Sequence, residues 1–148
     1  MREILFRGKR LDNGEWVEGF YTCFNNKEHR IYTGYAEKEH RIYTGYAETD
    51  CGDYYPDWWA VDPETVGQYT GLEDKNGRRI FEGDIVDHHA QGNIIVNRGV
   101  VKWDEKNGRW AHRLNTMEPA FSLFNPAAWE VIGNICDNPE LLKGGMEA

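Results

Sequence analysis

The sequence predicts a mainly β protein, in which an N-terminal β-meander packs on a small C-terminal barrel, SH3-like or similar, that ends in a short helix. Three observations predict this class. Sixteen glycines and three Asn-Gly pairs in 148 residues indicate many tight turns. Aromatic residues make up 14% of the chain, which favours strands and builds a core from few side chains. Helix-forming patterns are scarce by comparison.

Hairpins are expected at the Asn-Gly pairs, because both residues tolerate the positive φ angles of a tight turn. Asn13-Gly14 joins strands expected over residues 3–7 and 15–22. Asn76-Gly77 lies in a turn-rich stretch that leads into a strand expected at 83–86.

The third pair, Asn107-Gly108, joins strands expected over residues 99–103 and 109–114. Side chains two positions apart lie on the same face of a strand. Val101 and Trp103 are therefore both expected in the core.

The end of the chain combines a strand with the best helical signal. The apolar run at 131–135 predicts a strand that is buried on both faces. After it, Asn138 is expected to cap a helix that has Pro139 in its first turn and Gly144 beyond its end. A weaker signal predicts a single helical turn that begins at residues 62–64.

Residues 27–37 (KEHRIYTGYAE) are repeated without change as residues 38–48. Two copies are too few for a solenoid. Their strand-favouring composition, with a glycine near each centre, predicts one extended hairpin or loop excursion with a turn between the copies. Because lengthening a surface loop costs only about 0.6 kcal/mol per doubling, the fold is expected to survive the loss of one copy.

These signals divide the chain into two lobes. Residues 1–68 form the N-terminal β lobe, which carries the duplication at 27–37 and 38–48. Residues 69–148 form the C-terminal lobe, the small β-barrel.

The charge balance is acidic, with 17 basic and 25 acidic residues and a net charge of -8. This balance disfavours broad attraction to phosphate backbones. No apolar stretch is long enough for a membrane span or a signal peptide, so a cytoplasmic protein without a membrane partner is expected. Cys23, Cys51 and Cys136 are odd in number and widely spaced, which favours free thiols over disulfides or a zinc site.

The densest set of potential metal ligands consists of Asp84, Asp87, His88 and His89. Neighbouring residues of a strand face opposite sides, so His88 and His89 cannot both join Asp84. Too few local ligands are left for a closed site, and we expect no metal.

No established catalytic motif occurs in the chain: it has no nucleophile elbow, phosphate-binding loop, dinucleotide fingerprint or zinc-protease motif. Carboxylate pairs such as Glu82 and Asp84 occur in any acidic protein. His29, His40 and His112 have no partner in the sequence that would make one of them a convincing general base. We therefore expect no enzymatic activity and no cofactor.

The aromatic cluster at residues 54–59 (YYPDWW) is the most interesting feature for binding. Two adjacent Trp residues in a strand cannot both face one core, so one of them is a candidate for exposure. Exposed Trp and Tyr side chains anchor protein interfaces and also stack nucleobases. The candidate binding residues are Tyr54, Tyr55, Trp58 and Trp59.

Several segments carry a resemblance to a known family. They are residues 61–77 (VDPETVGQYTGLEDKNG), 80–86 (IFEGDIV), the opening MREILFRG, and the closing EVIGNI with NPELL at 138–142. In these segments the chain resembles the YopX family of phage and prophage proteins. The duplication is the clear departure from the family pattern.

The resemblance implies a small β-rich protein of temperate phages or mobile elements, expressed in the bacterial cytoplasm, with no known activity or cofactor. The residue types of the family signature are those that turns and barrel corners require, so we interpret them as mainly structural. They are Tyr69, Gly71, Asp74, Asn76, Gly77, Glu82, Gly83, Asp84, Gly133 and Asn134.

The leading hypothesis is a noncatalytic interaction module that binds a phage or host protein through its aromatic surface. A homo-oligomer is one state in which the module could act. The first alternative is a nucleic-acid-binding small barrel, which requires Trp58 or Trp59 to be exposed beside Arg or Lys and which the charge balance does not favour. The second is an acidic decoy that mimics DNA and occupies a host nuclease or regulator.

Overall fold

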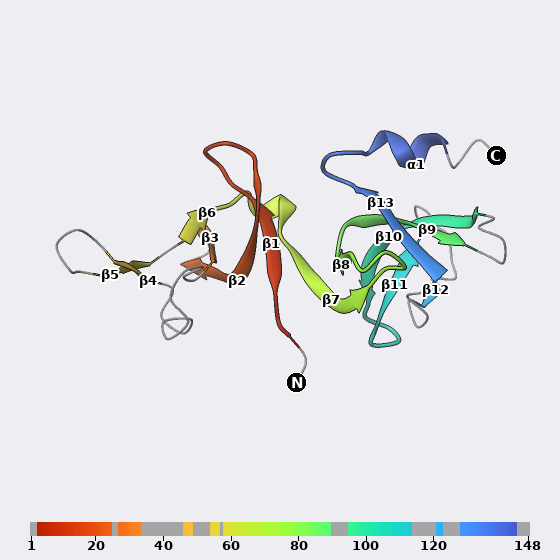
Figure 1. Ribbon diagram of the computed structural model, residues 1–148, viewed down its shortest axis with the longest axis horizontal. Helices are drawn as coiled ribbons and strands as arrows, with labels where there is room; N and C mark the ends of the chain where they lie inside the picture. Colours follow the sequence, from red (N-terminus) through yellow and green to blue (C-terminus); the bar gives the residue numbers. More distant parts are fainter. Residues whose placement is uncertain are drawn as a thin grey trace. The chain divides into compact units, whose positions relative to one another are not determined.

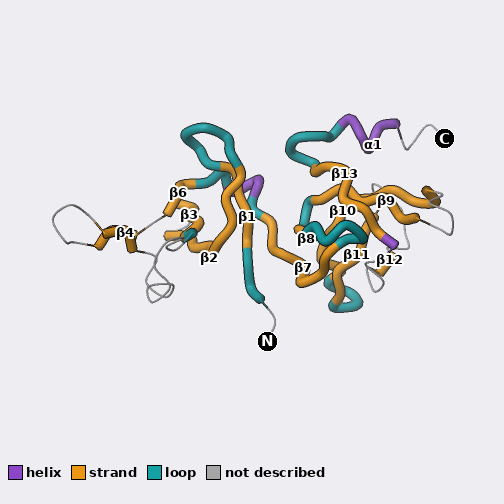
Figure 2. The backbone as a smooth tube through the Cα atoms, viewed as in Figure 1, coloured by secondary structure: helices purple, strands orange, loops and turns teal. Residues whose placement is uncertain are grey.

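The computed structural model describes residues 3–24, 27–33, 46–48, 54–56, 58–89, 95–113, 121–122 and 128–144. The chain divides into two compact units, Met1–Gln68 and Tyr69–Ala148. The described residues are mostly antiparallel strands, with one short helix near the end (Figure 1, Figure 2). The prediction of a mainly β protein is therefore confirmed.

The strands of the first unit are β1 (Phe6–Lys9), β2 (Trp16–Phe24), β3 (Glu28–Tyr32), β4 (Tyr46–Glu48), β5 (Tyr54–Pro56) and β6 (Trp58–Ala60). Hydrogen bonds join four of them in the order β6-β3-β2-β1, and every pairing is antiparallel. Strands β4 and β5 form a separate pair. The strands β1, β2 and β3 thus follow one another as a meander.

The first hairpin closes at Asn13-Gly14, where Gly14 has a φ of +73°. The Arg10 N–H donates to the Glu15 carbonyl at 2.9 Å, and Lys9 pairs with Trp16 at the end of the ladder. The pairing therefore starts and ends later than the composition alone predicts, because the turn occupies the residues between Lys9 and Trp16.

Two glycines allow close approach inside the first unit. A Cβ atom on Gly19 would lie 2.0 Å from the Tyr32 carbonyl oxygen of the neighbouring strand, and one on Gly8 would lie 3.1 Å from Val61. The same face of the sheet buries Ile31 completely. The small core of this unit thus depends on positions that have no side chain.

The second unit contains most of β7 (Gly67–Glu73), which follows the short 3-10 turn η2 (Pro63–Thr65). Its other elements are β8 (Arg79–Phe81), β9 (Asp84–His89), β10 (Ile95–Asp104), β11 (Arg109–Arg113), β12 (Phe121–Ser122), β13 (Trp129–Asn134) and the helix α1 (Glu140–Gly144). The main sheet has the order β12-β11-β10-β9-β13. A hairpin of β7 and β8 accompanies it.

The expected barrel is not closed among the described residues. Closure requires the two edge strands to pair, and the sheet instead ends at β12 on one side and β13 on the other. Strand β12 has only two residues, too few for a full ladder with another edge. In the part of the chain that the structure describes, the second unit is an open sheet with a hairpin beside it.

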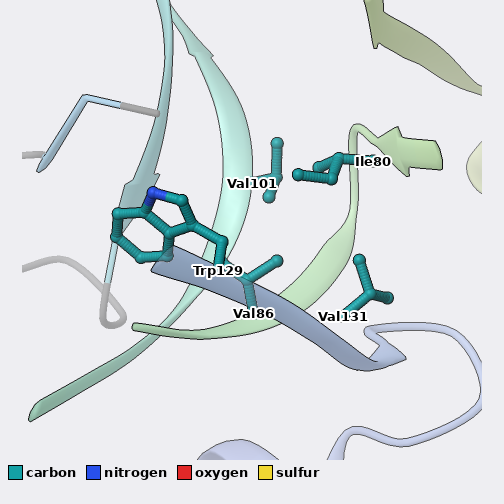
Figure 3. Close-up of a cluster of buried hydrophobic side chains, with 5 residues drawn as sticks. All are labelled: Ile80, Val86, Val101, Trp129 and Val131. Carbon is teal, nitrogen blue, oxygen red and sulfur yellow. The ribbon is translucent and has the colours of Figure 1, made fainter. Parts of the chain in front are cut away.

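The core of the second unit is a cluster of five buried side chains (Figure 3). Ile80 comes from β8, Val86 from β9, Val101 from β10, and Trp129 and Val131 from β13. The cluster therefore packs the β7–β8 hairpin against the main sheet. Burial of such side chains stabilises each position by about 1.5–3 kcal/mol.

Two expectations about burial are wrong in part. Val101 is fully buried, but Trp103, which shares its side of β10, is 42% exposed. Trp103 lies opposite Trp110 near the hairpin turn, and the two rings meet edge to face at 5.1 Å. Of the two, it is Trp110 that packs against the buried cluster. In β13, Ile132 is only half-buried, and Ile135, just after the strand, is exposed.

The C-terminal helix forms where it is expected, with a different role for Asn138. The Asn138 side-chain oxygen accepts a hydrogen bond from the Asn134 N–H at 3.3 Å. This oxygen therefore stabilises the turn before the helix and does not act as the helix cap. Gly144 is the last residue of α1 and does not lie beyond it. None of the helices in the described ranges has the length and apolar character that crossing a bilayer requires.

Candidate functional site: the aromatic face of the first unit

The predicted aromatic cluster falls on two strands. Tyr54 and Tyr55 lie in β5, where their backbones pair with Glu48 and Ala47 of β4, and their side chains are outside the described part of the structure. Trp58 and Trp59 lie in β6, opposite Tyr32 and Ile31 of β3.

Trp58 and Trp59 point to opposite faces of the sheet, as adjacent strand residues must. Both are half-buried, and an arginine stacks on each ring. The Arg30 guanidinium lies 3.8 Å from the ring centroid of Trp58, and that of Arg10 lies 3.5 Å from the ring centroid of Trp59. One face of each indole is thus covered by a cation from the same unit.

The register of β1, β2, β3 and β6 places further aromatic and charged side chains on the side of Trp58. Residues directly opposite in an antiparallel pair share a face, and so do alternate residues of one strand. We name this surface the aromatic face. It consists of Arg7, Lys9, Trp16, Glu18, Phe20, Glu28, Arg30, Tyr32 and Trp58.

Phe20 is the most exposed aromatic side chain of this face. It is 59% exposed and lies directly opposite Tyr32, which in turn lies opposite Trp58. Three aromatic side chains therefore follow one another across three strands. Phe20 is not among the residues predicted from the sequence, because it has no adjacent Trp. The signal that would have identified it is the alternation along β2, which places Trp16 and Phe20 on one side.

Charges of both signs border the aromatic side chains. The Arg7 guanidinium lies 4.7 Å from the ring centroid of Trp16, and Arg7 pairs in register with Glu18. Arg30 donates to the Glu28 carboxylate at 2.7 Å, and this hydrogen bond raises the pKa of Arg30. The positive charge of this face is thus largely matched by carboxylates.

Arg10, on the other side of the sheet, serves the first hairpin. Its guanidinium donates twice to the Asp12 carboxylate, and it also lies 3.7 Å from the Glu15 carboxylate. The hydrogen bond from Arg10 lowers the pKa of Asp12. Arg10 therefore connects the hairpin turn to Trp59.

The signature residues of the second unit make contacts within that unit. Asp74 is buried, and its carboxylate accepts hydrogen bonds from the N–H groups of Asn76, Arg78 and Val131, each at 2.9 Å. Gly77 closes the same turn with a φ of +79°. One side chain thus joins the β7–β8 hairpin to β13.

The other signature residues lie at irregular points of the strands. Gly71 has a φ of +86° where the register of β7 and β8 shifts, and the Tyr69 ring packs 5.5 Å from Phe81. Glu82 and Gly83 form the turn before β9, in which Gly83 has a φ of +89°.

Asp84, Gly133 and Asn134 complete the set. The Asp84 carboxylate accepts from the Phe81 N–H at 2.8 Å. A Cβ atom on Gly133 would lie 2.5 Å from the Asn138 side-chain oxygen. The Asn134 side-chain oxygen accepts from the N–H groups of Cys136 and Asp137.

The residues considered as metal ligands have other neighbours. Asp87 is buried in a two-pronged ion pair with Arg98, at 2.7 and 3.0 Å. His88 stacks on Trp129 at 4.4 Å, and His89 lies 2.9 Å from the Glu130 carboxylate. Among the described residues, no three potential ligands from His, Cys, Asp and Glu converge.

Comparison with known proteins identifies the family. The family described as YopX protein matches residues 5–143, which include both units and the signature segments. The chain belongs to the YopX family. No curated protein matches this YopX family member.

One solved structure is similar over nearly the whole length. It is the crystal structure of protein EF1440 from Enterococcus faecalis, which is 26% identical in sequence. The match covers 96% of this chain and 99% of that chain, with a TM-score of 0.56. The likeness therefore extends over both units of this YopX family member.

Proposed function

We propose that this YopX family member is a noncatalytic interaction module that binds a phage or host protein through its aromatic face. The observation that carries the proposal is Phe20, which is 59% exposed at the centre of a strand and flanked by Tyr32. Large aromatic side chains and arginines are the residues that most often dominate the binding energy of protein interfaces.

The aromatic face also defines the chemistry of the partner. Phe20 fits an apolar pocket on the partner, because burial of the exposed ring would contribute most of the binding free energy at this position. Arg7 and Lys9 both lie beside Trp16, but Arg7 is buried, whereas Lys9 is half-buried and lies 5.5 Å from the ring centroid. A partner surface that combines an apolar pocket for Phe20 with a carboxylate facing Lys9 fits best.

A protein fits this face better than a nucleic acid does. A nucleobase needs a free ring face for stacking, and Arg30 covers one face of Trp58. Phosphates need an excess of positive charge, and Glu18 and Glu28 lie on the same face as the three cations. The nucleic-acid alternative requires Trp58 or Trp59 to be exposed beside Arg or Lys. Arg30 lies beside Trp58, but this ring is half-buried, so only part of the requirement is met, and the test includes this alternative.

The test is affinity capture from lysates of infected and uninfected host cells, each divided into nuclease-treated and untreated halves. The baits are the unmodified protein, Phe20→Ala and Leu11→Ala. Leu11 is the matched control, because it is an exposed apolar residue of the same unit that lies in the hairpin turn, outside the aromatic face. We expect the unmodified protein and Leu11→Ala to capture a partner protein that stays bound after nuclease treatment. Phe20→Ala is expected to capture at least about tenfold less of it.

Two outcomes would overturn the proposal. Equal capture by Phe20→Ala would remove the aromatic face as the binding site. Loss of the captured material on nuclease treatment, together with salt-dependent binding of an oligonucleotide, would make the chain a nucleic-acid binder. Sedimentation velocity of the same three proteins separates a further case, in which the chain dimerises through Phe20 and the occupant of the face is a second copy.

A further inference from the structure

The opposite face of the first sheet brings a cysteine, a histidine and a tyrosine together. Cys23 and His29 are directly paired in the register of β2 and β3, and Tyr21 precedes Cys23 by two positions on the same face. The Cys23 Sγ lies 3.8 Å from the His29 Nε2, and the Tyr21 hydroxyl forms a hydrogen bond with the His29 Nδ1.

The imidazole is held in place on several sides. The Tyr21 and His29 rings are stacked at 5.9 Å with an angle of 11° between their planes, and Phe6 packs against Tyr21 at 5.6 Å. Both ring nitrogens of His29 therefore have a defined neighbour. Cys23 itself is an exposed free cysteine, open to reagents from solution.

This arrangement has the parts of an activated nucleophile: a thiol, a base within reach of its proton, and a third group that orients the base. We propose that Cys23 is a nucleophilic thiol that reacts with small-molecule disulfides, with His29 as its base and Tyr21 as the residue that positions the imidazole. The site lies on the face opposite to the aromatic face, so this proposal does not depend on the proposed function.

The reaction balances without a further component. In the tautomer with its proton on Nδ1, His29 donates to the Tyr21 hydroxyl oxygen and accepts the Cys23 proton at Nε2. The Cys23 sulfur then attacks one sulfur of the disulfide, so that a new S–S bond forms and the old one breaks. The leaving thiolate takes the proton from His29. The products are a mixed disulfide at Cys23 and one free small thiol.

Tyr21 suits the positioning role because it stays neutral. Burial raises the pKa of Tyr21, and the neighbouring Cys23 raises it further. The phenol therefore keeps its proton at physiological pH and can bond to the imidazole without adding a negative charge that would oppose ionisation of the thiol.

The test measures the rate at which single thiols react with 4,4′-dithiodipyridine, an uncharged disulfide. The variant Cys51→Ser/Cys136→Ser leaves only Cys23, and Cys23→Ser/Cys51→Ser leaves only Cys136, the second exposed cysteine of the described residues. At pH 6.5 we expect Cys23 to react at least about fivefold faster than Cys136. The ratio is expected to fall towards one near pH 10, where most thiols are ionised whatever surrounds them.

Substitutions of the neighbours identify the cause. In the chain that keeps only Cys23, His29→Gln is expected to lower the rate at pH 6.5 about fivefold and Tyr21→Phe about twofold, with both effects lost near pH 10. In the chain that keeps only Cys136, neither substitution is expected to alter the rate of Cys136. A Cys23 rate equal to that of Cys136 at pH 6.5, or one that His29→Gln leaves unchanged in a folded protein, would overturn the proposal.

Discussion

Single buried carboxylates determine much of the second unit. Asp74 accepts three backbone N–H groups from two separate segments, the turn at 74–78 and strand β13. An unsatisfied buried N–H costs about 1–3 kcal/mol, so a side chain that satisfies three of them is hard to replace. The same residue that shapes the hairpin turn therefore also holds β13 in register.

The Asp74→Ala variant is expected to lose about 3 kcal/mol of unfolding free energy, because three backbone donors lose their acceptor. Asp74→Asn, the matched control, keeps one oxygen and the shape of the side chain and is expected to lose about half as much. Urea denaturation of both variants measures the difference. A loss below about 1 kcal/mol in Asp74→Ala would contradict this assignment.

Asp104 gives the third hairpin a dependence on pH. Its carboxylate accepts from the Asn107 side chain at 2.8 Å and from Arg109 at 3.3 Å, and both hydrogen bonds lower the pKa of Asp104. A carboxylate whose pKa is lower in the folded state stabilises the fold fully at pH values above its unfolded pKa, which is about 3.9 for Asp. This stabilisation is lost as the pH falls through the folded pKa.

We therefore expect the advantage of the unmodified protein over Asp104→Asn in unfolding free energy to be full at pH 6 and to shrink as the pH falls below about 4. Urea denaturation of both proteins at several pH values measures it. A difference that does not change between pH 6 and pH 2.5 would show that the charge of Asp104 has no part in the hairpin.

At the scale of elements, the duplication is the unusual feature. The first copy supplies β3 with its fully buried Ile31, while the described part of the second copy supplies β4. Residues 34–45 lie outside the described residues, so the expected turn between the copies stays a prediction. Because the copies are identical, deletion of 27–37 or of 38–48 produces the same chain, and that chain retains a segment for each strand.

Deletion of one copy is expected to leave a folded protein whose melting temperature differs by less than about 5 °C, because the change in loop-closure free energy is logarithmic in loop length. Differential scanning calorimetry measures this. A loss of the cooperative transition would mean that both copies are required.

The identical copies also predict tolerance of a core substitution. Ile31→Asp is expected to cost no more than about 2 kcal/mol, because residues 39–43 can replace β3 at the expense of a longer loop after β2. Ile42→Asp alone is the control and is expected to be nearly neutral. Ile31→Asp/Ile42→Asp leaves no intact copy and is expected to cost about 4 kcal/mol or more, since a charge is then buried.

Equal costs for Ile31→Asp and for the double variant would show that the second copy cannot replace the first. In the chain with one copy deleted, Ile31→Asp leaves no intact copy and is expected to cost about 4 kcal/mol or more of unfolding free energy. Urea denaturation, followed by tryptophan fluorescence because Trp59 lies opposite Ile31, measures each case.

At the scale of the whole molecule, the net charge of -8 does not translate directly into an acidic surface. Asp74, Asp84, Asp87 and Asp104 are all buried, and each accepts hydrogen bonds inside the second unit. A DNA mimic needs carboxylates in an ordered exposed stripe, and these four are engaged in folding. The decoy hypothesis therefore rests on the other acidic residues.

The two units are expected to differ in local stability. The second unit has the contiguous cluster around Val86, whereas the buried apolar side chains described in the first unit are Ile31 and Val61. Amide hydrogen exchange is therefore expected to be slower at Val86 and Val101 than at Ile31. Exchange at Ile31 that is as slow as at Val86 would show that the two units open together.

Local features of the chain were predictable because the sequence determines them over a few residues. The three Asn-Gly turns, the strands around them and the C-terminal helical segment follow from backbone preferences that neighbours along the chain already set. Even so, the Asn138 side-chain oxygen accepts from the Asn134 N–H, and only the Asn138 backbone carbonyl accepts from the helix, at Leu141. Which donor a side chain meets depends on the folded turn.

The candidate sites depended on the pairing of strands. A β protein of the YopX family with its Asn-Gly turns could be predicted from the sequence alone. Three features follow from the folded chain and not from local patterns. The sheet of the second unit is open in its described part, Phe20 faces outward beside Tyr32, and His29 lies next to Cys23 and Tyr21. These positions depend on the register between strands, which contacts far apart in the sequence determine. A shift of one residue would turn each of these side chains to the other face.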